Sequence, residues 1–315
     1  MVLKNKTLKI IKKNKNINDN FLNKNIIFLN LPKKYCSKKD SMINIIPIKY
    51  KGKVTVGSGA EKGPLEILKA SYELEYFDCE LNFEPYLYGI YTYPFFNFQK
   101  HNNYILDLQS MLDTLSKNVS LDKFNIFLGS DHSTTISVVS FLEQKHLDFG
   151  IIVFDAHSDL REPWGEDTWL HACTSRIISK KHETVIFGVR SQDFYEHMFL
   201  ESKDGKNINI VYAKDLFKNP KFLDLYLKKL PKHVFISIDV DFFDPSIIKY
   251  TNTPEPGGFN WNQINFFLEK IFKRKNVIAL DLVEFAPNGE KKDYFSESYT
   301  LAKLVYKICA YKIKF

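Results

Sequence analysis

Seven short runs of almost wholly apolar residues recur along this chain of 315 residues, and segments of helical length separate them. The runs do not alternate with polar residues. Strands of this kind are buried on both faces, which is typical of a parallel sheet with helices on either side. The sequence therefore predicts an α/β fold with strands at residues 43–48, 124–128, 150–154, 184–189, 208–212, 234–238 and 277–282.

Helical patterns fill most of the gaps between these strands. They lie at residues 64–72, 104–116, 134–145, 170–180, 214–230, 263–274 and 296–311. Pro64 stands at the first position of one helix, where proline is well tolerated. Pro220 falls inside the fifth segment, which predicts a turn followed by a helix. No internal repeat or linker is visible, so we expect one domain over residues 25–315.

The lysine excess is confined to the beginning of the chain. The net charge is +7, but residues 1–40 hold eleven lysines and two acids, which leaves 33 basic against 35 acidic side chains in the remainder. We interpret residues 1–24 as a basic, disordered leader. Nucleic-acid binding is the less favoured alternative, because no aromatic residue precedes Phe21.

Several classes of protein are disfavoured by composition. No apolar run approaches the roughly 18 residues that a membrane-spanning helix needs, and the first residues lack the apolar core of a secretion signal. The four cysteines have no CxxC spacing, so they suit a reducing compartment better than a disulfide or zinc framework. We expect a cytoplasmic protein.

Polar clusters follow four of the predicted strands directly. They read GSDHS at 129–133, DAHSD at 155–159, DVDFFDP at 239–245 and DLVE at 281–284. The carboxyl ends of parallel strands share one edge of a sheet, and that edge is where the sites of open α/β folds lie. We therefore expect these side chains to meet. On an extended backbone, residues 155, 157 and 159 would also point to the same side.

A cluster of this composition indicates a metal site. Carboxylates and imidazoles brought together without a cation would repel each other or lose hydration at great expense. Two imidazoles and four carboxylates can serve two divalent ions if some carboxylates bridge. Oxygen-rich ligands without a thiolate favour Mn²⁺, with Zn²⁺, Fe²⁺ and Co²⁺ as alternatives. The predicted ligands are His132, Asp155, His157, Asp159, Asp239 and Asp241.

The ordered motifs resemble those of a known family. GSDHS, DAHSD, SIDVDFFDP at 237–245 and DLVEF at 281–285 are similar to the signatures of the ureohydrolases, the arginase and agmatinase family. GSGAEKGPLEILKAS at 57–71 resembles the family's first helix start, so the likeness extends over about residues 43–290. It implies a three-layer α/β/α fold with a mainly parallel eight-stranded sheet, two Mn²⁺ per subunit, and a homotrimer or homohexamer.

The resemblance also implies roles for individual residues. One metal would be held by His132, Asp155, Asp159 and Asp239, and the other by Asp155, His157, Asp239 and Asp241. His171 matches a mobile histidine that shuttles a proton, and Glu284 matches the acid that pairs with a guanidinium. Asp159 is counted as catalytic as well as a ligand.

Two departures from the family pattern leave the ligand positions intact. Ser130 replaces the second glycine of the usual Gly-Gly-Asp-His string. Residues 172–174, Ala-Cys-Thr, replace the His-Gly pair of many relatives, although a His-Ala-Cys form resembles some agmatinases. We therefore expect an active enzyme.

The substrate is expected to be agmatine, cleaved to putrescine and urea in polyamine biosynthesis. DLRE at 159–162 looks more like agmatinase than arginase, which has an asparagine at the place of Arg161. The loop up to His171 also carries Glu162, Glu166, Asp167, Trp164 and Trp169. Such a loop suits an ammonium group better than a carboxylate. The alternatives are arginine, guanidinobutyrate or formiminoglutamate as substrate, or a non-catalytic scaffold of the same fold.

Overall fold

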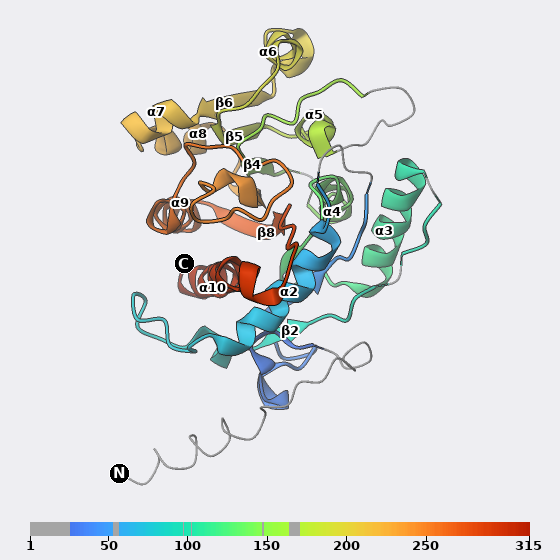
Figure 1. Ribbon diagram of the computed structural model, residues 1–315, viewed down its shortest axis with the longest axis vertical. Coiled ribbons are helices and arrows are strands. Elements are labelled where there is room, and N and C mark those ends of the chain that lie inside the picture. The colour runs from blue at the N-terminus through green and yellow to red at the C-terminus, as the bar shows by residue number, and fades with distance from the viewer. Residues whose placement is uncertain (1–25, 53–56, 97, 102, 147, 164–170) are drawn as a thin grey trace.

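A single eight-stranded sheet forms the centre of the molecule (Figure 1). The computed structural model describes residues 26–52, 57–96, 98–101, 103–146, 148–163 and 171–315. The strand order is β2-β1-β3-β8-β7-β4-β5-β6, and every neighbouring pair is parallel. The strands are β1 (Ile43–Pro47), β2 (Ile90–Thr92), β3 (Phe124–Leu128), β4 (Gly150–Phe154), β5 (Thr184–Val189), β6 (Ile208–Tyr212), β7 (His233–Asp239) and β8 (Asn276–Val283).

Both faces of the sheet are buried, as the apolar strand runs predict. In β4, Ile151 and Val153 pack into one hydrophobic core, whereas Ile152 and Phe154 pack into the other. Successive side chains of a strand point to opposite faces, so a wholly apolar strand requires cover on both.

Helices supply that cover in two layers (Figure 1). One core includes side chains of α2 (Gly63–Ala70), α8 (Phe222–Lys229), α9 (Trp261–Arg274) and α10 (Lys291–Lys314). The other includes side chains of α3 (Tyr104–Asn118), α4 (Thr134–Leu142) and α5 (Thr174–Ile178). The remaining helices are α6 (Phe194–Leu200) and α7 (Ala213–Lys218), with short 3₁₀ turns η2 (Phe28–Asn30), η3 (Lys33–Tyr35), η4 (Ala60–Lys62), η5 (Ser71–Glu73), η6 (Pro85–Tyr88), η7 (His171–Cys173), η8 (Lys203–Gly205) and η9 (Val240–Phe242).

The predicted elements correspond closely to the observed ones. All seven predicted strands are present, and the fifth helical segment is divided into α7 and α8 around Pro220. β2 and α6 were not predicted, and the sheet is wholly rather than mainly parallel. The expected leader lies outside the described residues. None of the described helices combines the length and apolar content that crossing a bilayer requires.

Candidate metal centre

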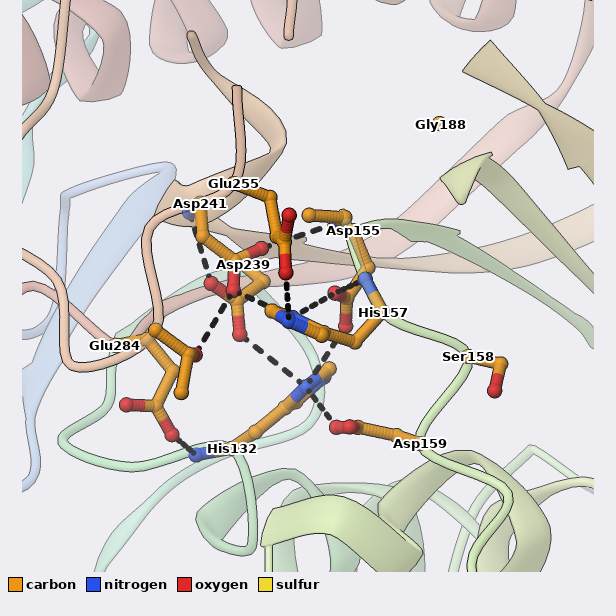
Figure 2. A network of polar contacts seen from close by, with 12 residues as sticks. His132, Asp155, His157, Ser158, Asp159, Gly188, Asp239, Asp241, Glu255 and Glu284 are labelled. Carbon is orange, nitrogen blue, oxygen red and sulfur yellow. Dashed lines mark hydrogen bonds and ion pairs between the residues drawn. The ribbon is translucent and has the colours of Figure 1, made fainter. Parts of the chain in front are cut away.

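The four polar clusters follow the four middle strands of the sheet. β3, β8, β7 and β4 are consecutive neighbours, although β4 comes soon after β3 in the chain. After β3 the chain therefore crosses over the places that β8 and β7 later fill, which makes a switch point of the kind where α/β sheets bind ligands. Figure 2 shows the outcome, with side chains from all four strand ends converging.

His132 and His157 each face a set of carboxylates. The Nδ1 atom of His132 lies 2.9 Å from Asp159 Oδ2, 3.2 Å from Asp155 Oδ2 and 3.5 Å from Asp239 Oδ2. The Nδ1 atom of His157 lies 2.9 Å from Asp241 Oδ2 and 3.7 Å from Asp155 Oδ1. Asp155 thus turns one oxygen toward each imidazole. The structure brings together all six residues that the sequence singles out.

Two buried atoms of this cluster indicate that a cation fits it. His132 Nδ1 and Asp155 Oδ2 are buried without a hydrogen-bond partner, yet they lie 3.2 Å apart. Buried polar atoms are nearly always satisfied, so an orphaned donor-capable nitrogen and carboxylate oxygen require an explanation. Two overlapping groups of ligand atoms have metal-site spacing: His132, Asp155 and Asp239, and Asp155, His157 and Asp241.

The charges of the cluster support the same interpretation. Burial and the charges of Asp241 and Asp155 raise the pKa of Asp239 well above its usual value. Burial lowers the pKa of His157, but hydrogen bonds to Asp155 and Asp241 outweigh it and raise that pKa to about 11. Without a cation the folded cluster therefore retains protons. Bound metal ions would take the place of those protons.

Asp159 does not continue an extended backbone from Asp155, so that expectation was wrong, and Asp241 departs from an extended backbone as well, whereas Asp239 ends strand β7. Asp159 adopts a left-handed conformation with φ 51°, and Asp241 lies within η9. Carboxylates curl the chain by accepting hydrogen bonds from nearby backbone N–H groups. Asp155 Oδ1 accepts from His157 N at 2.6 Å, and Asp239 Oδ1 accepts from Asp241 N at 2.9 Å.

His132 is also supported on its far side, by residues that sequence reasoning missed. Its Nε2 atom lies 3.1 Å from Ser237 Oγ. Behind it, Asp281 accepts a hydrogen bond from Thr135 Oγ1 at 2.7 Å, and burial raises the pKa of Asp281 to about 6 against the opposing hydrogen bond from Ser237. Ser237 stands two residues before Asp239 in an otherwise apolar strand, a signal that could have revealed it.

Glu284 lies beside the cluster, just beyond the end of β8. It is 4% exposed and adopts a left-handed backbone with φ 65°. Its Oε1 atom accepts a hydrogen bond from His132 N at 2.7 Å, and its Oε2 atom accepts one from Asn252 Nδ2 at 3.3 Å. Burial and the charge of Asp131 raise the pKa of Glu284 to about 8. Its two hydrogen bonds therefore orient this carboxylate, and its raised pKa shows that no nearby cation among the described residues balances its charge.

His171 begins η7 at the border of the site. Burial and the charge of Asp155 raise the pKa of Asp159, and contacts with His132 and, to a smaller extent, the electrostatic effect of His171 oppose that rise, so His171 lies within electrostatic range of the cluster. Glu162 is solvent-exposed, with an oxygen 3.9 Å from Arg176 Nη2. The other loop residues expected to face a substrate, Trp164, Glu166, Asp167 and Trp169, lie outside the described residues.

Comparisons with known proteins agree with this geometry. A model of the arginase family matches residues 41–310. The N(1)-aminopropylagmatine ureohydrolase of Synechocystis sp. is 32% identical over 284 residues, covering 87% of this chain and 90% of that protein. The agmatinase of Pyrococcus horikoshii is 41% identical over 184 residues, covering 58% of this chain and 61% of that protein. The solved structure of the agmatine ureohydrolase of Thermoplasma volcanium superposes with a TM-score of 0.75 at 23% identity, covering 87% of this chain and 91% of that one.

Proposed function

This chain is a ureohydrolase of the arginase family, a hydrolase of guanidino compounds, and from that membership we propose that its substrate is agmatine, cleaved to putrescine and urea with two bound Mn²⁺ ions. The observation that carries the proposal is the buried cluster in which His132 Nδ1 and Asp155 Oδ2 face each other without hydrogen-bond partners.

The proposed ligands divide into two overlapping sets. His132, Asp155, Asp159 and Asp239 would hold one ion, and Asp155, His157, Asp239 and Asp241 the other. The two oxygens of Asp155 support its bridging role, because each faces a different imidazole. Asp239 is suited to the second bridge, because it contacts His132 and because the charge of Asp241 raises its pKa. The predominance of carboxylate oxygens favours Mn²⁺.

Two divalent ions bound there would supply ionised water at neutral pH, which attack on a resonance-stabilised guanidinium requires. Glu284 would bind the guanidinium through charge-assisted hydrogen bonds and so fix its carbon over the metal centre. The hydrogen bonds from His132 N and Asn252 already orient this carboxylate.

His171 would deliver the proton that the departing amine needs. An amine leaves poorly unless it is protonated, and an imidazole exchanges protons near neutral pH. The position of His171 at the start of η7, with its charge acting on Asp159, suits this role.

N(1)-aminopropylagmatine is the second candidate substrate. The Synechocystis relative whose name specifies that compound matches 87% of this chain, a longer stretch than the agmatinase of P. horikoshii. The two compounds share a guanidinium and a cationic far end, and they differ in the length of the chain between.

The test is urea release from a panel of guanidino compounds with excess Mn²⁺, and again after chelation. The panel contains agmatine, N(1)-aminopropylagmatine, arginine, guanidinobutyrate and formiminoglutamate. We expect the highest kcat/KM for agmatine and no release after chelation. An equal or higher kcat/KM for arginine would end the proposal. Metal analysis adds a separate readout, with about two ions per chain expected.

A further inference from the structure

Residues 251–256 form one wall of the candidate metal centre. Thr253 Oγ1 donates to the carboxylate of Asp241 at 3.4 Å, and Asn252 Nδ2 donates to Glu284 at 3.3 Å. This wall therefore contacts both a proposed metal ligand and the proposed guanidinium anchor. Side chains that project from it border any substrate held between the two.

Arg190, at the end of β5, fixes the backbone of this wall. Its Nη2 atom donates to Glu255 O at 2.9 Å and to Asp241 O at 2.7 Å, and its Nε atom donates to Pro256 O at 3.1 Å. One half-buried guanidinium thus ties the backbone of Glu255 to that of a proposed ligand. The backbone from which Glu255 projects is therefore fixed relative to Asp241.

The carboxylate of Glu255 is the part of this wall that remains available. The side chain is 33% exposed, and its Oε1 atom lies 3.8 Å from His157 Nε2, too far for a hydrogen bond. Figure 2 shows Glu255 pointing at the His157 ring, while the opposite ring nitrogen faces Asp241. Glu255 therefore stands one imidazole ring away from the ligand cluster.

The carboxylate of Glu255 has no close cationic partner among the residues that the structure describes. His157 is the one group within ion-pair range, and its Nε2 atom lies 3.8 Å away. The guanidinium of Arg190 is near enough for its charge to interact with that of Glu255, but it directs its hydrogen bonds at carbonyl oxygens, including those of Gly188 and Phe243. The oxygens of Glu255 are therefore open to a hydrogen bond from a cationic group beside the site.

We propose that Glu255 binds the cationic far end of the substrate and so selects diamine-like guanidino compounds over amino acids, an inference that rests on the proposed function. The ammonium of agmatine lies six bonds of about 1.5 Å from its guanidinium carbon, a zigzag span of roughly 7 Å. A guanidinium at the metal centre can therefore place its ammonium beyond the His157 ring. The same carboxylate repels the α-carboxylate of arginine, which gives specificity by disfavouring the wrong substrate.

The variant Glu255→Gln tests this inference, with the exposed Glu201→Gln at the C-cap of α6 as the matched control. We expect the KM for agmatine to rise about tenfold in Glu255→Gln, with kcat within about twofold and the KM for arginine unchanged or lower. Putrescine, the proposed product, should bind the Mn²⁺-loaded variant about tenfold more weakly in calorimetry. Mn²⁺ content should equal that of the wild type, and Glu201→Gln should match the wild type throughout.

Two results would overturn the inference. If Glu255→Gln loses Mn²⁺ affinity while the ratio of the KM values for agmatine and arginine stays the same, Glu255 acts through His157. If agmatine and putrescine bind the variant as tightly as the wild type, Glu255 does not contact the cation. Failure of the proposed function looks different, because the wild type itself would then release no urea from agmatine. The binding measurement still decides the role of Glu255 in that case.

Discussion

His132 is held at three points, and this distinguishes it from His157. Its Nδ1 atom faces carboxylates, its Nε2 atom lies 3.1 Å from Ser237 Oγ, and its backbone N–H binds Glu284. His157 has 24% of its side chain exposed, and among the described residues its Nε2 atom faces only the distant Glu255. Partners behind a metal-binding histidine set its tautomer and orientation. The two imidazoles should therefore differ in how much their surroundings contribute to metal binding.

Replacing Ser237 by alanine should weaken metal binding without unfolding the protein. The variant removes the group between His132 Nε2 and Asp281, and loss of such a partner typically lowers metal affinity about 10–100-fold. Competition with a coloured chelator measures the effect. Ser137→Ala is the control, because Ser137 is a buried serine that donates to Leu108 O away from the site. Equal metal affinities in the two variants would show that the contact behind His132 contributes nothing to metal binding.

The raised pKa values of the cluster predict how pH changes the effect of bound metal ions on the stability of the protein. The pKa values of Asp239, Asp241 and His157 are all raised on folding, that of His157 to about 11, and only Asp155 is shifted downward. The metal-free folded chain thus binds more protons than the unfolded chain, and its stability falls as pH rises from about 4 toward the folded pKa values. Metal ions displace those protons, so the stability of the metal-loaded form should not fall in this way as pH rises.

The rise in Tm on adding saturating Mn²⁺ should therefore be larger at pH 8 than at pH 6. Differential scanning calorimetry on chelator-treated protein measures it directly. The double variant His157→Asn/Asp241→Asn should show a smaller Mn²⁺-dependent shift than the wild type at both pH values, because it removes ligands of one ion and leaves the set around His132 intact. A shift in the wild type that is independent of pH would mean that bound ions and protons do not compete for these side chains.

At the scale of single elements, α6 is a helix that the sequence did not predict but that holds part of the candidate site in place. Its exposed residues include Phe194 and Tyr195, so no apolar stripe marks the face that packs inward. The helix is anchored by polar groups instead. Glu196 closes a capping box with Asp193, and it accepts hydrogen bonds at 2.8 Å from both Ser158 Oγ and Leu160 N. It thereby positions the segment between His157 and Asp159.

Glu196→Ala should destabilise the protein and loosen that segment. The buried donors Ser158 Oγ and Leu160 N and the partly buried donor Asp193 N would lose their acceptor, for which we expect about 2–3 kcal/mol of lost unfolding free energy. Urea denaturation measures the loss, and hydrogen exchange at Leu160 N should accelerate. Glu201→Ala, on the exposed end of α6, should change the stability by less than about 0.5 kcal/mol. A Glu196→Ala variant as stable as this control would contradict the anchoring role.

The sequence could predict features that have a local signal, but not those that depend on long-range contacts. Long apolar strands and the ligand residues that follow them are local signals, so seven strands and the convergence of His132, Asp155 and Asp241 were predictable. β2 has three residues, too few to show a period. Contacts such as His132 to Ser237, or Arg190 to Glu255, join residues 105 and 65 positions apart and depend on the finished fold. The left-handed turn at Asp159 has no local marker either.

At the scale of the whole molecule, a buried ion pair ties the C-terminal helix to the segment before β2. Lys307 of α10 is 5% exposed, and its Nζ atom lies 2.9 and 3.0 Å from the two oxygens of Asp78. Next to it, Tyr306 donates to Tyr76 O at 2.5 Å. The segment around Asp78 has little regular structure, so these contacts determine how it is held against α10.

Lys307→Ala should lower the unfolding free energy by about 3–5 kcal/mol, because it leaves a buried carboxylate unpaired. The double variant Lys307→Met/Asp78→Asn should recover much of that loss, since it removes both buried charges and keeps an acceptor for the backbone N–H groups of Glu80 and Leu81. Chemical denaturation of the two variants beside the exposed-site control Lys314→Ala measures both effects. No recovery in the double variant would mean that packing around Lys307, and not its charge, supports the contact.

The strand order has a consequence for how the protein is made. β8, the last strand in the chain, pairs on one side with β3 and on the other with β7 in the middle of the sheet. On a ribosome, two half-sheets can form early, but each keeps an unpaired inner border until nearly the whole polypeptide has emerged. Such late, long-range pairing is slow and leaves nascent chains prone to aggregation. The candidate metal centre is therefore completed last, in the same event that closes the sheet.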